Sequence, residues 1–540
     1  MKISKKELLK GTRYLYPLIF VVIGAVIITG CSALLEKRPK LTWEPGITVT
    51  TLYGKIKGYE SSPDTYAWKA IPYAKPPVGE LRWKAPQDPD PWTDLREATE
   101  FCDQCTQFTR GLAIAGKEDC LYLNIWRPKS AETGLPVYFW IHGGGNSVNT
   151  ASSNRYDGVK IARKSNMVIV TINYRIGPMG WFTHPGLRHG KNAKDDSGNY
   201  GTLDIIKALE WVRNNIEAFG GDPGNITISG QSAGAFNVLS LLISPIAKGH
   251  FHKAFAQSGR QRVSPISTGD AHVNAVVERL LVNDGTVADK SAAKAYIAKM
   301  SNADIERYLR SKTAGEILKG HEMLFFTMIK FPNIFADSTV ISKDGFDALK
   351  DPNRYNQVPI ILGSNKDEMK LFMGLGSQYD KLDRATYQKV AQARSNKWKL
   401  SGVDNVAKNL RAHKSQPDVY AYQFNYGAYN PDGYNAWPVD HKGVNYALKF
   451  GSSHVLAVSF FWGNRWFFGL EKLLFREDNR MGYEALTDAM MSYVGEFARK
   501  GKPGSAGGVL WNPWSNTEGE SKRILFDAND KEALIEMSKK

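Results

Sequence analysis

The sequence predicts an α/β fold, in which a mostly parallel, twisted sheet is flanked by helices. Short apolar runs that are typical of buried strands occur at 136–141, 358–362 and 419–424. A further β-prone run, 225–229, leads through a tight glycine-rich turn into a stretch with helical character at 236–243. Strands that pass directly into turns and helices are the usual pattern of this class.

A single domain accounts for most of the chain. The 540 residues are 42% hydrophobic and 23% charged, which is an ordinary globular composition. We find no internal repeat with a period of roughly 20–50 residues. The short Gly/Ser-rich stretch at 501–508 indicates a surface loop rather than a linker. We therefore expect one domain over 49–540, long enough to bury a large core.

The N-terminal segment is typical of an export signal. Five basic residues precede an apolar run at 15–28, and the segment ends in Ile28-Thr29-Gly30-Cys31. This ending resembles a bacterial lipobox, where a peptidase cleaves before the cysteine and the thiol carries a lipid. We expect 1–30 to be a signal peptide, 31–48 to hold lipidated Cys31 and a tether, and the protein to be exported and lipid-anchored to the bacterial cell envelope. An uncleaved anchor is an alternative, although the run is short for a membrane span; a mis-started cytosolic chain is another.

The net charge and the distribution of possible metal ligands bear on which partners the protein binds. The formal net charge is +16, of which residues 1–30 carry +4, so the rest of the chain keeps +12. A basic surface attracts anionic lipids or envelope polymers. No basic run with interleaved aromatic residues indicates nucleic-acid binding. Too few ligands cluster for a zinc site, so we expect neither nucleic acid nor a metal.

Three cysteines remain when Cys31 carries a lipid: Cys102, Cys105 and Cys120. An exported protein can keep a disulfide, and one that closes a loop of about 15 residues contributes roughly 3 kcal/mol. A Cys102–Cys105 redox pair is the alternative, but no thioredoxin-like βαβ pattern surrounds it. One thiol is left over in either case.

The strongest chemical motif is Gly230-Gln231-Ser232-Ala233-Gly234. A β-prone run precedes it and a helix follows, which is the strand–turn–helix context of a nucleophile elbow. The glycines are needed because Cβ atoms do not fit into so tight a turn. Ser232 is thereby placed at the N-terminus of a helix, whose dipole favours developing negative charge.

A second motif points to the same reaction. The strand at 136–141 runs directly into His142-Gly143-Gly144-Gly145. Consecutive glycines expose backbone N–H groups, which are the donors that the oxyanion of a tetrahedral intermediate requires. A flexible glycine turn is the structural alternative, but the elbow farther along the chain favours an oxyanion loop.

Together with further segments, these motifs resemble the type-B carboxylesterases, the family that includes cholinesterases and bacterial para-nitrobenzyl esterases. The resemblance runs from about Val49 to the C-terminus. The other segments that carry it are Ile71–Gly79, Leu81–Trp83, Glu118–Asn124, Thr171–Gly177, Trp211–Val212, Asn215–Ile216 and Phe219–Pro223.

The resemblance implies an α/β-hydrolase fold with large helical insertions and a serine carboxylesterase that needs no cofactor. It further implies that Gly144, Gly145 and Ala233 supply the oxyanion N–H donors. It also implies a disulfide between Cys105 and Cys120.

The remaining members of a catalytic triad follow the serine in the order acid, then histidine. A buried-type strand at 358–362 ends in a loop in which the family places its catalytic Glu, which selects Glu368; the neighbouring Asp367 is the alternative. Met369 stands where the family has Gly. Of the later histidines, His454 matches the family's catalytic segment, whereas His413 sits at an expected helix end and His441 in a polar loop.

Three departures from the family pattern concern the surroundings of the triad. Relatives commonly carry Glu just before the serine and Glu three residues after the histidine, where this chain has Gln231 and Ala457. Asn146 replaces an aromatic residue beside the oxyanion glycines. Each change alters polarity near the site. The alternative for Gln231 is that its side chain faces water, in which case the identity of this residue hardly matters for the site.

The sequence thus predicts a carboxylic ester hydrolase that forms an acyl-serine intermediate on a small-molecule ester. A lipase, thioesterase or polyester hydrolase is a closely related alternative, which substrate profiling separates. A non-catalytic, neuroligin-like binding protein is the alternative of another class, and the intact Ser232, Glu368 and His454 argue against it.

Overall fold

The computed structural model describes residues 41–376 and 378–540. The predicted signal peptide, Cys31 and residues 32–40 of the expected tether lie outside the described residues. The compact unit spans Trp43–Lys540, and Trp43 packs against the Arg127 guanidinium and the Trp68 ring. In the part of the chain that the structure describes, no helix is both long and apolar enough to cross a membrane.

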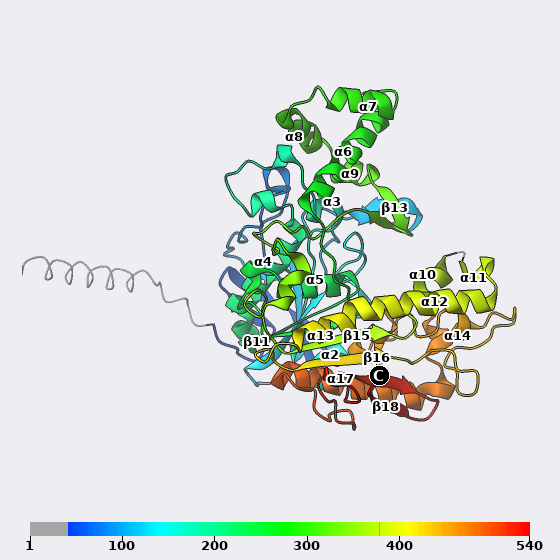
Figure 1. The fold of residues 1–540 in the computed structure, drawn as a ribbon. Coiled ribbons are helices and arrows are strands. Elements are labelled where there is room, and N and C mark those ends of the chain that lie inside the picture. Colours follow the sequence, from blue (N-terminus) through cyan, green and yellow to red (C-terminus); the bar gives the residue numbers. More distant parts are fainter. Residues whose placement is uncertain (1–40, 377) are drawn as a thin grey trace, which may run out of the picture. The chain divides into compact units, whose positions relative to one another are not determined.

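An 11-stranded sheet forms the centre of the unit, in the order β18-β17-β16-β15-β12-β11-β9-β10-β8-β4-β3 (Figure 1). Neighbours from β17 to β10 in this order are parallel, and antiparallel strands complete both edges. The expected mostly parallel sheet of an α/β-hydrolase is confirmed. The strands are β3 (Tyr59–Ser62), β4 (Thr65–Pro72), β8 (Tyr122–Pro128), β9 (Leu135–Ile141), β10 (Val168–Ile172), β11 (Gly221–Gln231), β12 (Lys253–Gln257), β15 (Ile360–Asn365), β16 (Val419–Phe424), β17 (Arg523–Ala528) and β18 (Ala533–Ser538).

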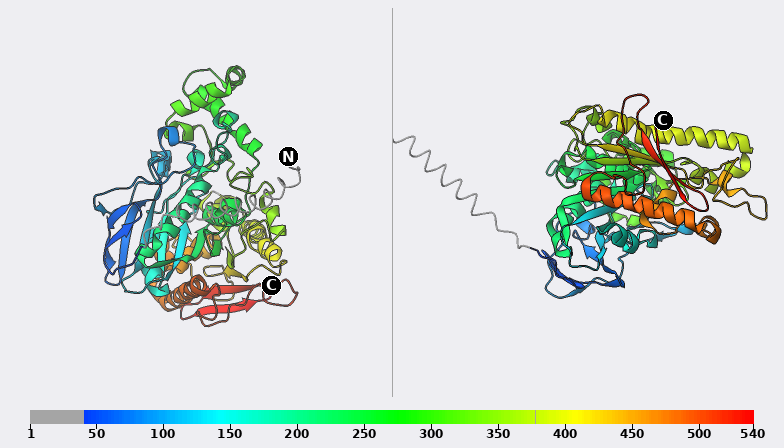
Figure 2. Two further views of the ribbon diagram at one scale, coloured as in Figure 1. Left: turned by 90° about the vertical axis from the view of Figure 1, so that its left-hand side faces the viewer. Right: turned by 90° about the horizontal axis from the view of Figure 1, so that it is seen from below.

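Helices cover both faces of the sheet, as the continuous burial of its central strands requires. Every residue of β9 and β10 is buried. In Figures 1 and 2, α2 and α17 lie against one face and α4 and α5 against the other. These helices are α2 (Val159–Ser165), α4 (Tyr200–Asn215), α5 (Ala233–Leu242) and α17 (Arg480–Lys500).

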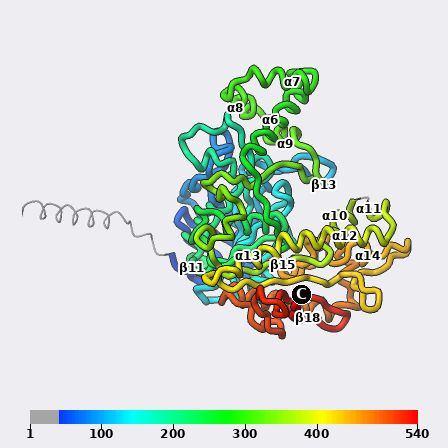
Figure 3. Tube along the Cα trace, viewed as in Figure 1, coloured from blue at the N-terminus to red at the C-terminus, as the bar shows by residue number. Residues whose placement is uncertain are grey.

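The expected helical insertions are present after β12 and β15. The first forms α6 (Ile266–Asn283), α7 (Lys290–Ile297), α8 (Asn302–Ser311) and α9 (Ala314–Lys319). The tube in Figure 3 shows these helices projecting from the rest of the compact unit. A short hairpin of β13 (Glu322–Phe325) and β14 (Met328–Lys330) follows. The second insertion forms α10 (Lys370–Leu375), α11 (Gln378–Lys381), α12 (Arg384–Lys399) and α13 (Asn405–Leu410).

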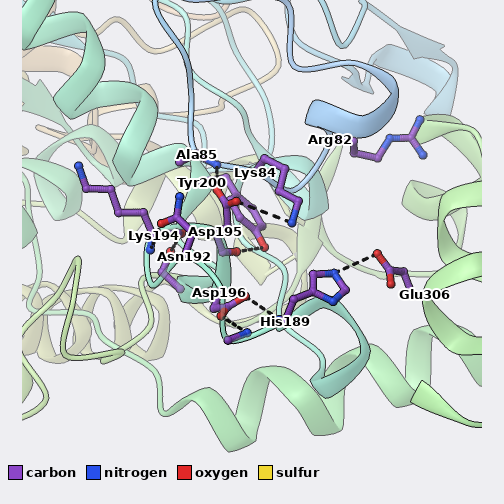
Figure 4. A network of polar contacts seen from close by, with 12 residues as sticks. Arg82, Lys84, Ala85, His189, Asn192, Lys194, Asp195, Asp196, Tyr200 and Glu306 are labelled. Carbon is purple, nitrogen blue, oxygen red and sulfur yellow. Dashed lines mark hydrogen bonds and ion pairs between the residues drawn. The ribbon is translucent and has the colours of Figure 1, made fainter. Parts of the chain in front are cut away.

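A polar network fixes the first insertion to the body of the domain (Figure 4). His189 Nε2 lies 3.3 Å from Glu306 of α8, while the His189 backbone N–H donates to Asp196. The adjacent Asp195 accepts a hydrogen bond from the Ala85 N–H. Apolar residues of α6, α8 and α9 also share one core cluster with Trp83 and Phe182, so the insertion is packed rather than loosely attached.

The topology brings the candidate residues to one edge of the sheet. β9 ends before the glycine loop, β11 ends before Ser232, and β15 ends before Glu368. Because these strands are parallel, their carboxyl ends lie at the same edge, where ligands bind in open α/β sheets.

Candidate active site

Ser232 lies in a strained turn between β11 and α5. Its φ of 58° and ψ of −123° are rarely adopted by a residue with a side chain. The turn tolerates no Cβ on either glycine: one on Gly230 would lie 2.5 Å from the Gly234 carbonyl carbon, and one on Gly234 would lie 2.0 Å from Ile141 O. The Ser232 N–H donates to Gln257 O over 2.9 Å, which ties the elbow to β12.

The glycine loop packs against this elbow. A Cβ on Gly143 would lie 3.1 Å from Ser232 Cβ. Gly144 and Gly145 have φ values of 110° and 66°, and within the described residues neither N–H donates to another backbone group. Ala233 is the first residue of α5, so its N–H has no partner inside the helix. Three backbone donors are thus available beside the serine.

Buried side chains hold the glycine loop in place. The His142 ring contacts Gly143 O over 2.9 Å and stacks on Tyr174, whose hydroxyl donates to His142 O. Burial lowers the pKa of His142 to about 4, so this ring is neutral at physiological pH. Asn146, with a φ of 57°, accepts a 3.0 Å hydrogen bond from Asn237 of α5. The asparagine that replaces the family's aromatic residue therefore links the loop to the nucleophile helix.

The structure brings Glu368 and His454 together. His454 Nδ1 lies 2.5 Å from Glu368 Oε2, and the Glu368 side chain is fully buried. The other carboxylate oxygen accepts the Asn365 N–H over 2.8 Å. An imidazole held at Nδ1 in this way keeps Nε2 for proton transfer.

The alternative acid and the alternative histidines lie elsewhere in the fold. Asp367 accepts the Ser452 N–H and pairs with Lys370 at 3.2 Å, so its carboxylate has a structural role. His413 contacts the Leu349 carbonyl. His441 is exposed in its loop.

Gln231 contacts the His454 imidazole directly. Its Nε2 lies 3.0 Å from His454 Nε2, and the side chain is only 3% exposed. The alternative that Gln231 faces water is therefore wrong. In the described structure His454 Nε2 makes this contact and no hydrogen bond with Ser232 Oγ. A proton transfer from the serine to His454 would therefore require the hydroxyl to replace the amide. Catalytic hydrogen bonds often form only once substrate is bound.

Two aromatic rings that no sequence motif indicated pack on His454. The ring centre of Trp398, from α12, lies 5.0 Å from that of His454, and the ring centre of Phe372, from α10, lies 5.2 Å from it. Trp398 Nε1 donates to Ser258 O, directly after β12. No local pattern predicts these contacts, because both rings come from the second insertion and reach the site only through tertiary packing.

The predicted disulfide between Cys105 and Cys120 is confirmed, with the sulfur atoms 2.10 Å apart. Cys102 is free, so the alternative redox pair with Cys105 is not formed. Burial raises the pKa of the Cys102 thiol to about 11, which keeps it protonated and unreactive.

Comparison with known proteins agrees with this geometry. The sequence model of the "Carboxylesterase family" matches residues 45–400. A para-nitrobenzyl esterase of Bacillus subtilis (strain 168) is 36% identical over 330 residues, which cover 60% of this chain and 63% of that protein. A fumonisin B1 esterase of Sphingopyxis macrogoltabida is 34% identical over 341 residues, covering 61% of this chain and 58% of that one. The chain thus aligns with less than two thirds of these relatives' length.

Solved structures match over more of the chain. A PNB esterase structure superposes with a TM-score of 0.71 at 27% identity, covering 92% of this chain and 97% of that one. A carboxylesterase of Geobacillus stearothermophilus superposes with a TM-score of 0.70 at 30% identity, covering 91% and 98%.

Proposed function

Because the chain belongs to the carboxylesterase family, we propose that it hydrolyses carboxylic esters through an acyl-enzyme formed on Ser232. The observation that carries this proposal is the buried Glu368–His454 pair beside a strained serine and unpaired backbone N–H groups. These are the three parts that acyl transfer requires: a nucleophile with its base, an orienting acid and an oxyanion site.

The reaction proceeds in two halves. His454 Nε2 takes the proton of Ser232 while Oγ attacks the ester carbonyl, and Glu368 stabilises the imidazolium that forms. The N–H groups of Gly144, Gly145 and Ala233 bind the oxyanion. His454 then protonates the departing alcohol, and a water molecule, deprotonated by the same imidazole, releases the acid.

A labelling experiment tests the nucleophile. A fluorophosphonate probe should modify Ser232, and Ser232→Ala should abolish labelling and lower kcat by several orders of magnitude without a large change in the melting temperature. Full activity in Ser232→Ala, or labelling of another serine, would refute the assignment. A screen of p-nitrophenyl esters from acetate to palmitate separates a carboxylesterase from a lipase, and thioester and polyester substrates test the other related activities.

We further propose that the protein is exported and anchored through a lipid on Cys31. The basic and apolar segment before Ile28-Thr29-Gly30-Cys31 supports this, and the Cys105–Cys120 disulfide fits an oxidising compartment. Cys31→Ser should block metabolic labelling with a fatty acid and leave an unprocessed precursor. A wild-type protein that fractionates with the cytosol would contradict the proposal.

A further inference from the structure

Two arginines beside the candidate active site have no acidic partner. Arg260 and Arg262 follow β12 at the edge of the sheet that holds the triad. Within the described residues, neither forms an ion pair with a carboxylate, whereas Arg175 is paired with Asp204 and Arg188 with Asp270. Both of the unpaired side chains are exposed.

Arg260 is connected to the catalytic imidazole by a single ring. Its guanidinium carbon lies 5.0 Å from the ring centre of Trp398, which in turn lies 5.0 Å from the ring centre of His454. The preceding residue is packed on the nucleophile helix, since a Cβ on Gly259 would lie 3.1 Å from Ala235 Cβ.

Arg262 is connected to the oxyanion loop through the β13–β14 hairpin. Its Nη2 donates to Phe331 O, just after β14, and Met328 at the start of β14 lies 2.8 Å from a Cβ built on Gly145. The hairpin's own carboxylate, Glu322, is paired with Arg279 at 2.6 Å. It is therefore not available to neutralise the two arginines.

The surroundings of both arginines disfavour their charge. Desolvation by the surrounding protein lowers the pKa of Arg260 and of Arg262, and the nearby Arg260 lowers the pKa of Arg262 further. Guanidinium groups nevertheless stay protonated in proteins. Two neighbouring cations without a counter-charge are stabilised when an anion binds, and guanidinium groups match the geometry of a carboxylate.

We propose that Arg260 and Arg262 form a carboxylate-binding subsite, so that the preferred substrates are esters carrying a negative charge. The inference rests on the proposed esterase function and specifies its substrate class. The positive net charge of +12 outside residues 1–30 acts in the same direction, because it raises the local concentration of anionic substrates.

Two matched substrate pairs test the subsite in the purified full-length protein. The first compares mono-p-nitrophenyl suberate with its neutral primary amide, so that the charge is on the acyl group. The second compares 3-carboxyphenyl butyrate with 3-carbamoylphenyl butyrate, so that the charge is on the alcohol. The readout is the ratio of kcat/KM for the anionic ester to that for its neutral partner.

We expect the wild type to prefer the anion in at least one pair, and Arg262→Gln to lower that ratio about tenfold, as is typical when a hydrogen bond to a charged group is lost. Arg262→Lys should retain part of the preference and Arg262→Glu should reverse it. Arg260→Gln should also lower this ratio. Loss of the Arg260–Trp398 contact can change kcat/KM for both esters, but a change common to both esters cancels in the ratio. Arg96→Gln is the matched control, because Arg96 also lies over a tryptophan, Trp92, but belongs to a separate small sheet. This sheet consists of β1 (Thr48–Thr51), β2 (Gly54–Lys57) and β5 (Arg96–Glu97).

A wild type that hydrolyses the neutral esters at least as well as the anions in both pairs would overturn the subsite and leave the esterase function standing. An unchanged ratio in both arginine variants would do the same. A wild type that hydrolyses neither member of either pair, nor any simple p-nitrophenyl ester, would instead refute the proposed function.

Discussion

Replacement of Gln231 by glutamate should move the acidic limb of the pH–kcat/KM profile to higher pH. In the structure the Gln231 amide nitrogen lies 3.0 Å from His454 Nε2, and the side chain is 3% exposed. A carboxylate at this position would stabilise the imidazolium, which cannot act as a base. A higher pH is then needed before the neutral imidazole predominates.

The size of the shift follows from the short distance and the burial. Two unit charges about 4 Å apart interact by about 4 kcal/mol at an effective dielectric constant near 20, which is an upper bound because the introduced carboxylate also loses solvation. One pH unit corresponds to about 1.4 kcal/mol. We therefore expect the limb to move by about one to two units, with some loss of thermal stability because a buried charge has been introduced.

The assay compares pH–kcat/KM profiles of the wild type and two variants on p-nitrophenyl butyrate. Gln231→Met is the control, because it has similar volume and no charge and should leave the acidic limb in place while removing the contact with His454. An unchanged limb in Gln231→Glu would refute the electrostatic coupling. An equal displacement in Gln231→Met would show that the lost amide contact, not the charge, is responsible.

Three further predictions concern neighbouring residues. Glu368→Gln should lower kcat by about 10⁴-fold, whereas Asp367→Asn should mainly lower the melting temperature; comparable kinetic losses would contradict the roles assigned to the two acids. Gly145→Ala should reduce kcat at least tenfold, because φ is 66° and the new Cβ would meet Met328; unchanged steady-state kinetics would argue against a role of this loop in oxyanion binding. Replacing Cys105 and Cys120 together by Ser should cost roughly 3 kcal/mol, which urea unfolding measures; a variant as stable as the wild type would show that the disulfide is dispensable.

The sequence was sufficient for the fold class because the fold class depends on local patterns, and patterns of the same kind selected the candidates for the triad. The buried strands are continuous apolar runs, and the elbow needs glycines at fixed positions, as the clashes at Gly230 and Gly234 illustrate. The order of serine, acid and histidine then limited the candidates. The sequence selected Glu368 and kept Asp367 as the alternative; in the folded chain it is the Glu368 carboxylate that contacts His454, whereas Asp367 accepts a hydrogen bond from the Ser452 N–H.

The surroundings of the triad could not be predicted in the same way. Trp398 and Phe372 reach His454 from helices of an insertion, and their spacing along the chain carries no signal of that contact. The direction of the Gln231 side chain was likewise undetermined, because it depends on the strained turn at Ser232. These are tertiary arrangements in which several distant segments fix one side chain.

A charge introduced beside His454 should also affect which substrates the enzyme prefers. Gln231 contacts the imidazole on its Nε2 side, and Arg260 lies beyond the Trp398 ring that covers it. A carboxylate introduced by Gln231→Glu would attract Arg260 and repel a substrate carboxylate, so this variant should also lower the ratio of anionic to neutral ester turnover. Because the Trp398 ring lies between Arg260 and His454, charges at residue 231 and at the arginine subsite are not in direct contact. In a partly hydrated site such charges interact weakly, and we expect about a twofold fall.

This last effect has a distinctive dependence on salt. The Debye length is about 10 Å at 0.1 M ionic strength, so the twofold fall in the Gln231→Glu variant should be largest in dilute buffer and nearly vanish at high salt. The tenfold loss expected for Arg262→Gln should persist, because it removes a direct contact. A fall of equal size in Gln231→Met, or one that salt does not diminish, would show that residue 231 acts on selectivity through packing rather than through charge.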